Sequence, residues 1–502
     1  MTVLREIFSQ EQLRFCVPRE KPLLCATVNG TKIMLKICAK SEGIFKREYR
    51  KQLLVSICIT IIPFAHGFGM GWFSVILAKL QSPLETALDF VITVNEGSWM
   101  GGFASLGGGC GNIIFGILAD LVGRKASLYF LAIPYAISWV LVYFAKSVEY
   151  LYVGRFLAGI SGGGSYVMVP IFIGEIADPK IRGRLTSFFS LTLNSGIFIG
   201  YIVTARLPYH FIPVLGVALP AIFFLSQLFF PETPVFLIQR GLDERAKKSF
   251  KFYRNFQSIT KESIEEFQIE FDNLKCAVTA SHNINMNVTW RDFCNKRAAI
   301  AFANSLVLMM LNIFCGAYAI LYYTSNIFIQ ARADLDPDTN TIIVGLVQVT
   351  GVCAATILVD KFGRKPLLMF SCGATCVGLT IFGIYGYMLQ NTTVDVSGLS
   401  SWLPLVNVCL VLFVVNAGLI PIPFVLLVEL MPPKIRAKAS AICLVLFNIF
   451  GFILMKLFPV ALEDFGLALP MWSFALLDLF GLVYISLFIK ETKGMSLNKV
   501  DP

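Results

Sequence analysis

The residues of this chain that suit ligand binding are neutral amides, hydroxyls and aromatic rings set in long apolar stretches. Such groups fit an uncharged ligand rich in hydroxyls, because each buried polar group needs a hydrogen-bond partner. For any one of them, hydrogen bonding between helices is the alternative role. The predicted binding residues are Ser190, Asn194, Asn312, Tyr318, Tyr322, Tyr323, Gln348, Asn416, Phe424 and Asn448.

The sequence shows no pattern typical of an enzyme. It has no nucleophile–base pair, no cluster with the spacing of metal ligands and no phosphate-binding loop. The 13 cysteines are scattered, mostly within the apolar stretches, and packing is the favoured role over disulfide bonding. We therefore predict no catalytic activity, no cofactor and no metal site.

Charged motifs occur twice, once in each half of the chain. Asp120-Leu-Val-Gly-Arg-Lys reappears as Asp360-Lys-Phe-Gly-Arg-Lys, 240 residues later, and each copy lies between two apolar stretches. A second pair, Glu175 with Arg182 and Glu429 with Arg436, keeps a spacing of seven residues. We predict ion pairs that close one side of a moving protein, while a charge belt that sets membrane topology is the alternative. The predicted gating residues are Asp120, Arg124, Glu175, Arg182, Asp360, Arg364, Glu429 and Arg436.

These residues must be held by membrane helices. The 502 residues are 56% hydrophobic and 15% charged, against roughly a quarter charged in soluble proteins. Stretches such as 53–77, 298–331 and 396–428 contain no charged residue, and about 20 apolar residues cross a bilayer. We predict an all-α membrane protein with twelve transmembrane helices in two six-helix halves, and a ligand site between the halves. The predicted regions are an N-terminal tail 1–50, a first bundle 51–230, an intracellular helical linker 231–297, a second bundle 298–489 and a C-terminal tail 490–502.

The distribution of charge sets the expected topology. With both termini in the cytosol, the outer loops hold four basic residues and ten acidic ones, and nearly all other Lys and Arg fall inside. This is the positive-inside bias, so the net charge of +10 indicates a membrane and not a nucleic acid partner. Three charged residues lie within the spans: Arg155, Lys456 and Asp478. Because a charge inside the membrane is costly, each of them is expected to have a partner or a function. We predict that Asp478 pairs with Lys456.

Several motifs carry a resemblance to a known family over residues 50–500. They include Gly154-Arg155, the segment Pro170–Arg182, Pro231-Glu232-Thr233-Pro234, Pro421-Ile422-Pro423 and Glu491-Thr492-Lys493-Gly494. The chain resembles the sugar porters of the major facilitator superfamily, and most closely the insect branch that includes facilitated trehalose transporters. Gly71-Trp72, Glu96-Gly97-Ser98-Trp99, Gln348 and Lys456 carry the likeness to that branch.

The resemblance implies a plasma-membrane transporter of a neutral sugar. Tyr322 and Tyr323 match the aromatic pair that gates the outer side in glucose transporters, while Asn312 stands where the family has glutamines. Gly69 replaces the aspartate of the proton-coupled members, which favours a uniporter. A proton-linked porter of another solute, acting through Asp478, and a sugar sensor that does not transport are the alternatives. Asn391, in an outer Asn-Thr-Thr sequence, is the predicted glycosylation site.

Overall fold

A computed structural model describes residues 46–83, 88–256, 261–286, 290–293, 295–391, 397–432 and 434–493. Every regular element in these ranges is a helix. The chain divides into two units by its internal contacts. The linker unit contains residues 46–55, Gly174–Gly183 and the described part of 231–286; the membrane unit contains the other described residues.

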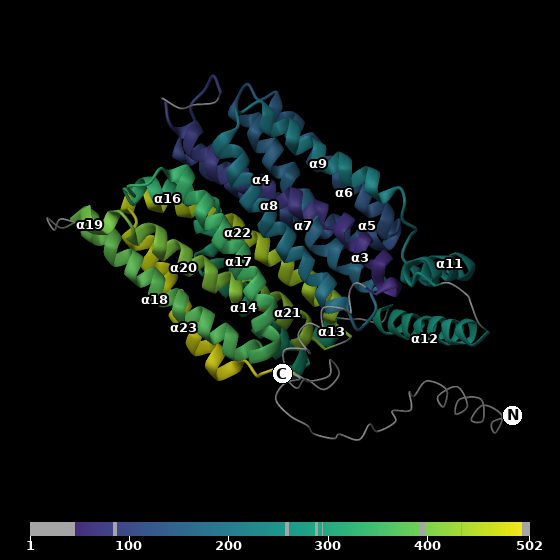
Figure 1. The fold of residues 1–502 in the computed structure, drawn as a ribbon. Helices are drawn as coiled ribbons and strands as arrows, with labels where there is room; N and C mark the ends of the chain where they lie inside the picture. Colours follow the sequence, from purple (N-terminus) through teal and green to yellow (C-terminus); the bar gives the residue numbers. More distant parts are fainter. Residues whose placement is uncertain are drawn as a thin grey trace, which may run out of the picture. The chain divides into compact units, whose positions relative to one another are not determined.

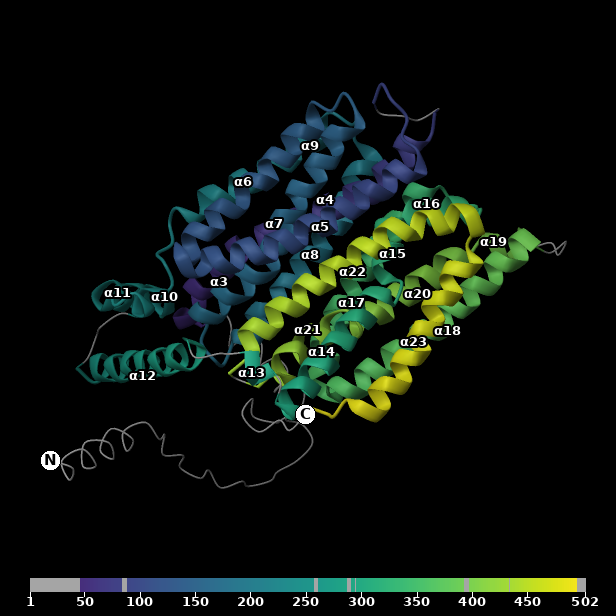
Figure 2. The same ribbon diagram turned by 180° about the vertical axis from the view of Figure 1, so that it is seen from behind.

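The membrane unit has its helices in two sets, one from each half of the chain, which lie side by side in both views (Figures 1 and 2). The first set is α3 (Arg50–Ile59), whose residues up to Val55 belong to the linker unit, α4 (Ile61–Gln81), α5 (Val94–Leu121), α6 (Arg124–Tyr143), α7 (Val148–Ile176), α8 (Arg182–Arg206) and α9 (Phe211–Gln227). The short η1 (Arg47–Tyr49), in the linker unit, precedes it. The second is α13 (Trp290–Phe293), α14 (Lys296–Phe314), α15 (Ala317–Tyr322), α16 (Thr324–Gln330), α17 (Pro337–Phe362), α18 (Arg364–Asn391), α19 (Ser397–Ser400), α20 (Leu403–Ala417), α21 (Pro421–Leu430), α22 (Arg436–Phe465) and α23 (Ala468–Phe488). The prediction of a membrane protein with two bundles is confirmed.

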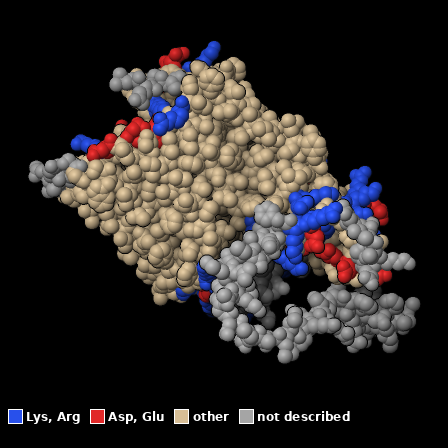
Figure 3. All heavy atoms as spheres, viewed as in Figure 1, with Lys and Arg blue, Asp and Glu red and all other residues tan. Residues whose placement is uncertain are grey.

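The number of spans agrees with the predicted twelve. Among the described residues, 11 helical stretches are long and apolar enough to cross a membrane, and α9 is a shorter apolar helix at the place of the sixth span. Figure 3 shows a broad area of this unit on which neither basic nor acidic side chains are exposed. Such a surface suits the hydrocarbon core of a bilayer.

Glycines hold the helices of the first half close together. A Cβ on Gly67 of α4 would lie 2.0 Å from the backbone oxygen of Leu193 in α8. A Cβ on Gly107 of α5 would lie 2.1 Å from the backbone oxygen of Phe156 in α7. Only glycine permits such backbone contact, which is common between membrane helices. Glycine therefore lets α4 pack closely on α8, and α5 on α7.

Two spans are broken in the middle, which the sequence reading did not foresee. The seventh span divides into α14, α15 and α16, and Gly316 adopts the left-handed conformation (φ +80°) at the first break. The tenth span divides into α20 and α21 at residues 418–420, just before Pro421. Irregular backbone at membrane depth survives only where protein or a water-filled cavity surrounds it.

The linker unit contains three helices, α10 (Pro234–Gln239), α11 (Asp243–Tyr253) and α12 (Lys261–Met286). The longest of the three is α12, which ends at Met286. Their shared core is apolar and includes Phe250, Phe267 and Phe271. The mixed charges lie around this core.

Candidate functional site

A cavity lies in the membrane unit, between helices of the two halves. No Asp, Glu, Lys or Arg is among the lining residues. They are His66, Met70, Ala104, Ser105, Gly108, Asn112, Gly159, Gly163, Tyr166, Ile313, Tyr318, Tyr322, Phe424, Leu444, Phe447, Asn448, Gly451 and Met455. A lining without charged residues suits a neutral polar ligand.

Two amides from opposite halves converge on one backbone oxygen in this cavity. The Nδ2 of Asn112, on α5, donates to the Leu444 carbonyl at 3.2 Å, and the Nδ2 of Asn448, on α22, donates to the same oxygen at 2.8 Å. The Oδ1 of Asn112 has no hydrogen-bond partner among the described residues. The two side chains therefore offer their acceptor oxygens, which suit hydroxyl donors.

Aromatic rings form another wall of the cavity. Tyr166 stacks on Phe424 with ring centroids 6.0 Å apart, so rings from α7 and α21 meet across the two halves. Phe447 makes edge contacts with Phe424 at 5.5 Å and with Tyr318 at 5.8 Å. Such faces pack against the apolar side of a sugar ring while the hydroxyls find polar partners.

The structure brings four of the ten predicted binding residues to the cavity: Tyr318, Tyr322, Phe424 and Asn448. The other six are not among its lining residues. Asn194 and Asn416 each donate to the carbonyl four residues earlier, and the Tyr323 hydroxyl donates to the Met455 carbonyl at 2.8 Å. Gln348 is fully buried, and neither atom of its amide has a partner among the described residues. The remaining two are Ser190 and Asn312.

Asn312 supports the broken tenth span. Its Nδ2 donates to the carbonyls of Leu419 at 2.7 Å and Ile420 at 2.9 Å, inside the break between α20 and α21. The side chain is fully buried. Asn312 therefore satisfies carbonyls that an unbroken helix would satisfy itself.

Arg155 lies behind the cavity and contacts its wall. The guanidinium carbon is 4.2 Å from the centroid of the Phe73 ring and 5.7 Å from that of Tyr322. Its nitrogens donate to the carbonyls of Met100 and Gly69, each at 3.4 Å. Cation–π contact and carbonyl acceptors offset part of the cost of burying this charge.

Polar contacts join the two halves at one end of the membrane unit, which we call the Lys79 end. Lys79, on α4, forms an ion pair with Asp338, on α17, at 2.8 Å. Asn326, on α16, donates to Gln81, on α4, at 2.7 Å. These contacts hold the two halves together at the Lys79 end.

The prediction that Asp478 pairs with Lys456 is wrong. The ammonium of Lys456 donates to Asn95 Oδ1 and, at 2.8 Å, to Ser98 Oγ, and it lies 4.4 Å from the Trp99 ring centroid. Asp478 is fully buried on α23, and neither carboxylate oxygen has a partner among the described residues. Lys456 points to α5 of the other half, which supplies neutral acceptors near the end of the span.

At the opposite end, the second half holds a compact cluster of charges. Arg364, at the start of α18, pairs with Glu429 at 3.1 Å, and the Thr492 hydroxyl also donates to Glu429. Glu491 accepts the backbone N–H groups of Arg364 and Lys365 at 3.0 and 2.9 Å. Burial alone would raise the pKa of Glu491, but these backbone donors outweigh it and hold the pKa below its ordinary value.

The glycines of the two repeated loops make tight turns with positive φ. Gly123 and Gly363 have φ of +102° and +91°, and each is followed directly by a helix. In the first loop Arg124 lies 3.5 Å from Asp120. The side chain of Asp360 lies outside the described residues. Arg436 donates to the Met431 carbonyl at 3.1 Å, so this arginine ties the end of α21 to the start of α22.

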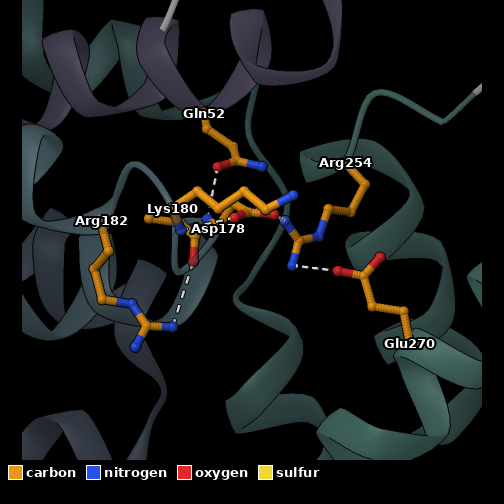
Figure 4. Close-up of polar contacts among 7 residues, drawn as sticks. Gln52, Asp178, Lys180, Arg182, Arg254 and Glu270 are labelled. Carbon is orange, nitrogen blue, oxygen red and sulfur yellow. Dashed lines mark hydrogen bonds and ion pairs between the residues drawn. The ribbon is translucent and has the colours of Figure 1, made fainter. Parts of the chain in front are cut away.

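The linker unit has its own polar cluster, shown in Figure 4. Asp178 accepts the Lys180 backbone N–H at 2.8 Å and forms an ion pair with Arg254, whose other nitrogen lies 2.6 Å from Glu270. The Asp178 N–H donates to Gln52 at 2.9 Å. Within the same unit Thr233 donates to Glu175 at 2.5 Å and Arg182 donates to the Ala177 carbonyl at 3.4 Å. Thr233–Glu175 thus repeats Thr492–Glu429, which supports the internal duplication.

Sequence reasoning missed several lining residues, chiefly Asn112, Tyr166 and His66. The ring of His66 packs so closely against α7 that a Cβ on Gly162 would lie 2.1 Å from it. Asn112 had a usable signal, because it is the one amide in the glycine-rich stretch 97–119. Tyr166 also follows a glycine run, Gly162–Gly164.

Comparisons with known proteins agree with this architecture. The sequence profile of the family described as "Sugar (and other) transporter" matches residues 43–502. "Facilitated trehalose transporter Tret1" of Polypedilum vanderplanki is 30% identical over 90% of this chain and 87% of its own length. "Facilitated trehalose transporter Tret1-2 homolog" of Drosophila sechellia is 31% identical over 92% of each chain. The inward-open xylose transporter XylE of E. coli has a similar fold, with a TM-score of 0.69 at 21% identity over 88% of this chain and 97% of that one.

Proposed function

The chain belongs to the family of sugar (and other) transporters, and on that premise we propose that it carries a neutral sugar, trehalose or a hexose, down its gradient by alternating access. The chain is a multi-pass membrane protein and a sugar transporter of the major facilitator fold. The proposal of a neutral sugar as the substrate rests on the cavity, which combines acceptor amides and aromatic faces with no charged lining residue. Trehalose is the substrate named for the insect relatives.

The sidedness of the protein follows from its charges. We propose that the end with the Gly123 and Gly363 turns faces the cytosol, together with both termini, in the plasma membrane. The basic loops at that end support this orientation. Asn391, exposed at the end of α18, is then the site of an outer glycan.

The ion pairs of the cytosolic end supply the switching mechanism in this proposal. Arg364–Glu429 and its threonine partner form a unit that rearranges as the halves rock, while the Lys79 end opens. Gly69, next to the cavity residue Met70, gives α4 no proton-carrying group at the position used by coupled relatives. Uniport therefore fits better than proton symport.

Purified protein in liposomes tests the function. We expect labelled trehalose or a hexose to equilibrate across the bilayer at rates that an imposed proton gradient does not change. Accumulation above equilibrium under a proton gradient would contradict uniport. Sugar binding without flux, in protein shown to be folded, would identify a sensor and overturn the proposal of transport.

A further inference from the structure

The linker unit carries a concave site, here called the lysine pocket, that transport does not use. Its lining residues are Glu244, Lys247, Lys248, Lys251, Phe256, Ile264 and Phe267. They come from α11, the residues directly after it, and α12, which lie side by side in both views (Figures 1 and 2). Three ammonium groups and one carboxylate give the pocket a net charge of +2 at neutral pH.

Two acidic residues of the linker unit, Asp243 and Glu270, do not balance this charge, because they are engaged elsewhere. Asp243 pairs with Lys275, whose pKa this hydrogen bond raises, and Glu270 pairs with Arg254. Lys248 and Lys251 are exposed, and neither has a carboxylate within ion-pair distance among the described residues. The positive charges that line this one pocket repel one another, so an anion bound between them is stabilised.

One of the three lysines is held in place. The ammonium of Lys247 donates to Gln268 Oε1 on α12 at 2.5 Å, which orients it with a neutral partner and leaves its charge uncompensated. Lys251 lies on the next turn of α11, with its ammonium 6.0 Å from the Phe256 ring centroid. The lysines therefore line one side of the pocket.

The other side of the pocket is apolar. Phe256 and Phe267 pack with ring centroids 4.7 Å apart, and Phe267 belongs to the core of the unit. Ile264 is 51% exposed beside them. A ligand with an anionic group and a carbon skeleton would satisfy both sides.

We propose that the lysine pocket binds a phosphate monoester, with the phosphate held by Lys247, Lys248 and Lys251 and its carbon skeleton packed on Ile264 and Phe256. Lysine suits this role because it meets a phosphate as a point charge, and a doubly charged monoester matches several ammonium groups better than a carboxylate does. The phosphorylated headgroup of an anionic lipid and a soluble phosphate ester share this chemistry. The site is independent of the proposed transport function.

Binding to the full-length protein tests the proposal. The probes are soluble inositol bisphosphate and nanodiscs that hold the protein with or without a phosphoinositide. We expect saturable binding to the wild type, and the Lys248→Ala/Lys251→Ala variant to lose at least about tenfold in affinity. Saturation by the soluble probe indicates a free ester as one ligand source, whereas saturation in nanodiscs alone indicates a lipid headgroup. Either result supports the phosphate site.

Arg245→Ala is the matched control, since Arg245 is an exposed basic residue of α11 outside the pocket lining. Lys248→Gln removes the charge but keeps a long polar side chain, so it is less apt to disturb folding than the alanine variant. Thermal unfolding of each variant measures whether folding is affected. Absence of saturable binding by both probes would overturn the proposal. Equal losses in Arg245→Ala and Lys248→Gln would do the same, because they would show general charge attraction.

Discussion

At the residue scale, Gly108 determines whether Asn448 can face the cavity. A Cβ on Gly108 would lie 2.3 Å from Asn448 Oδ1, whereas a Cβ on Gly109 would make an ordinary 3.5 Å contact with Asn448 Cβ. We expect Gly108→Ala to displace the amide and weaken sugar uptake by about tenfold, as a lost polar contact of about 1.4 kcal/mol implies. Uptake kinetics in liposomes measure this.

Gly109→Ala is the control for that prediction, because it adds the same methyl group to the same helix. We expect uptake by this variant to stay near that of the wild type. If both variants lose uptake equally, the effect belongs to α5 as a whole and Asn448 has no special part in it.

The hydrogen bonds of Asn312 lead to a prediction about the stability of the protein. Replacing it with Ala leaves the carbonyls of Leu419 and Ile420 without their donor, at a cost of about 1–3 kcal/mol. We expect a lower unfolding temperature for Asn312→Ala in detergent. Ser190→Ala serves as the comparison, because Ser190 is also a predicted binding residue. If Ser190→Ala lowers the unfolding temperature by the same amount, Asn312 has no special role in stability.

The candidate site could be predicted in part from residue types alone. Tyr318 and Asn448 were found because a sugar cavity needs amides and rings, and both line the cavity. Asn312 is of the same type, but its amide is used 107 residues away along the chain. Nothing in a single sequence distinguishes an amide that supports a broken helix from one that meets a ligand, since both are buried and both need partners.

At the scale of elements, Glu491 stabilises the start of α18. It accepts two backbone N–H groups there, and a negative charge at a helix N-terminus is favourable. The pKa of Glu491 is lower in the folded protein than its ordinary value. The ionised carboxylate therefore stabilises the fold fully when the pH is above the ordinary pKa. This stabilisation is lost as the pH falls through the lower pKa of the folded state. We expect Glu491→Gln to lower the unfolding temperature at neutral pH, with the difference from the wild type shrinking in acid.

Glu463→Gln removes an exposed carboxylate at the far end of α22 and serves as the control. Its unfolding temperature should follow the wild type at every pH. A Glu491→Gln difference that stays constant down to acid pH would count against the charge as the cause.

The elements themselves were largely predictable, because apolar length and charge-free runs specify membrane helices directly. The turns at Gly123 and Gly363 were predictable too, since a repeated glycine between two apolar stretches has few other uses. The breaks at Gly316 and near Pro421 were not. Glycine and proline also occur inside unbroken helices here, as Pro134 does in α6, so their effect depends on what surrounds them.

At the scale of the whole membrane unit, the contacts at the Lys79 end hold the two halves together. Gln81 and Asn326 meet there across the halves. We expect a Gln81→Cys/Asn326→Cys protein, joined by a short reducible cross-linker, to stop sugar flux, because the halves can no longer separate at this end. Uptake into liposomes before and after reduction measures it.

Each single cysteine variant treated with the same reagent is the control, and we expect both to keep their flux. Flux that persists through a complete cross-link would mean that the Lys79 end does not open during transport. The alternating-access proposal would then need another outer path.

The Leu444 carbonyl has one further consequence. It accepts one side-chain amide from each of the two bundles, those of Asn112 and Asn448. When α5 swings away from α22, Asn112 must release this oxygen, and its amide hydrogens then become available to a solute. The pocket would then donate hydrogen bonds through Asn112 as well as accept them, so that uptake and release meet chemically different surfaces and the two directions of flux need not have equal affinity.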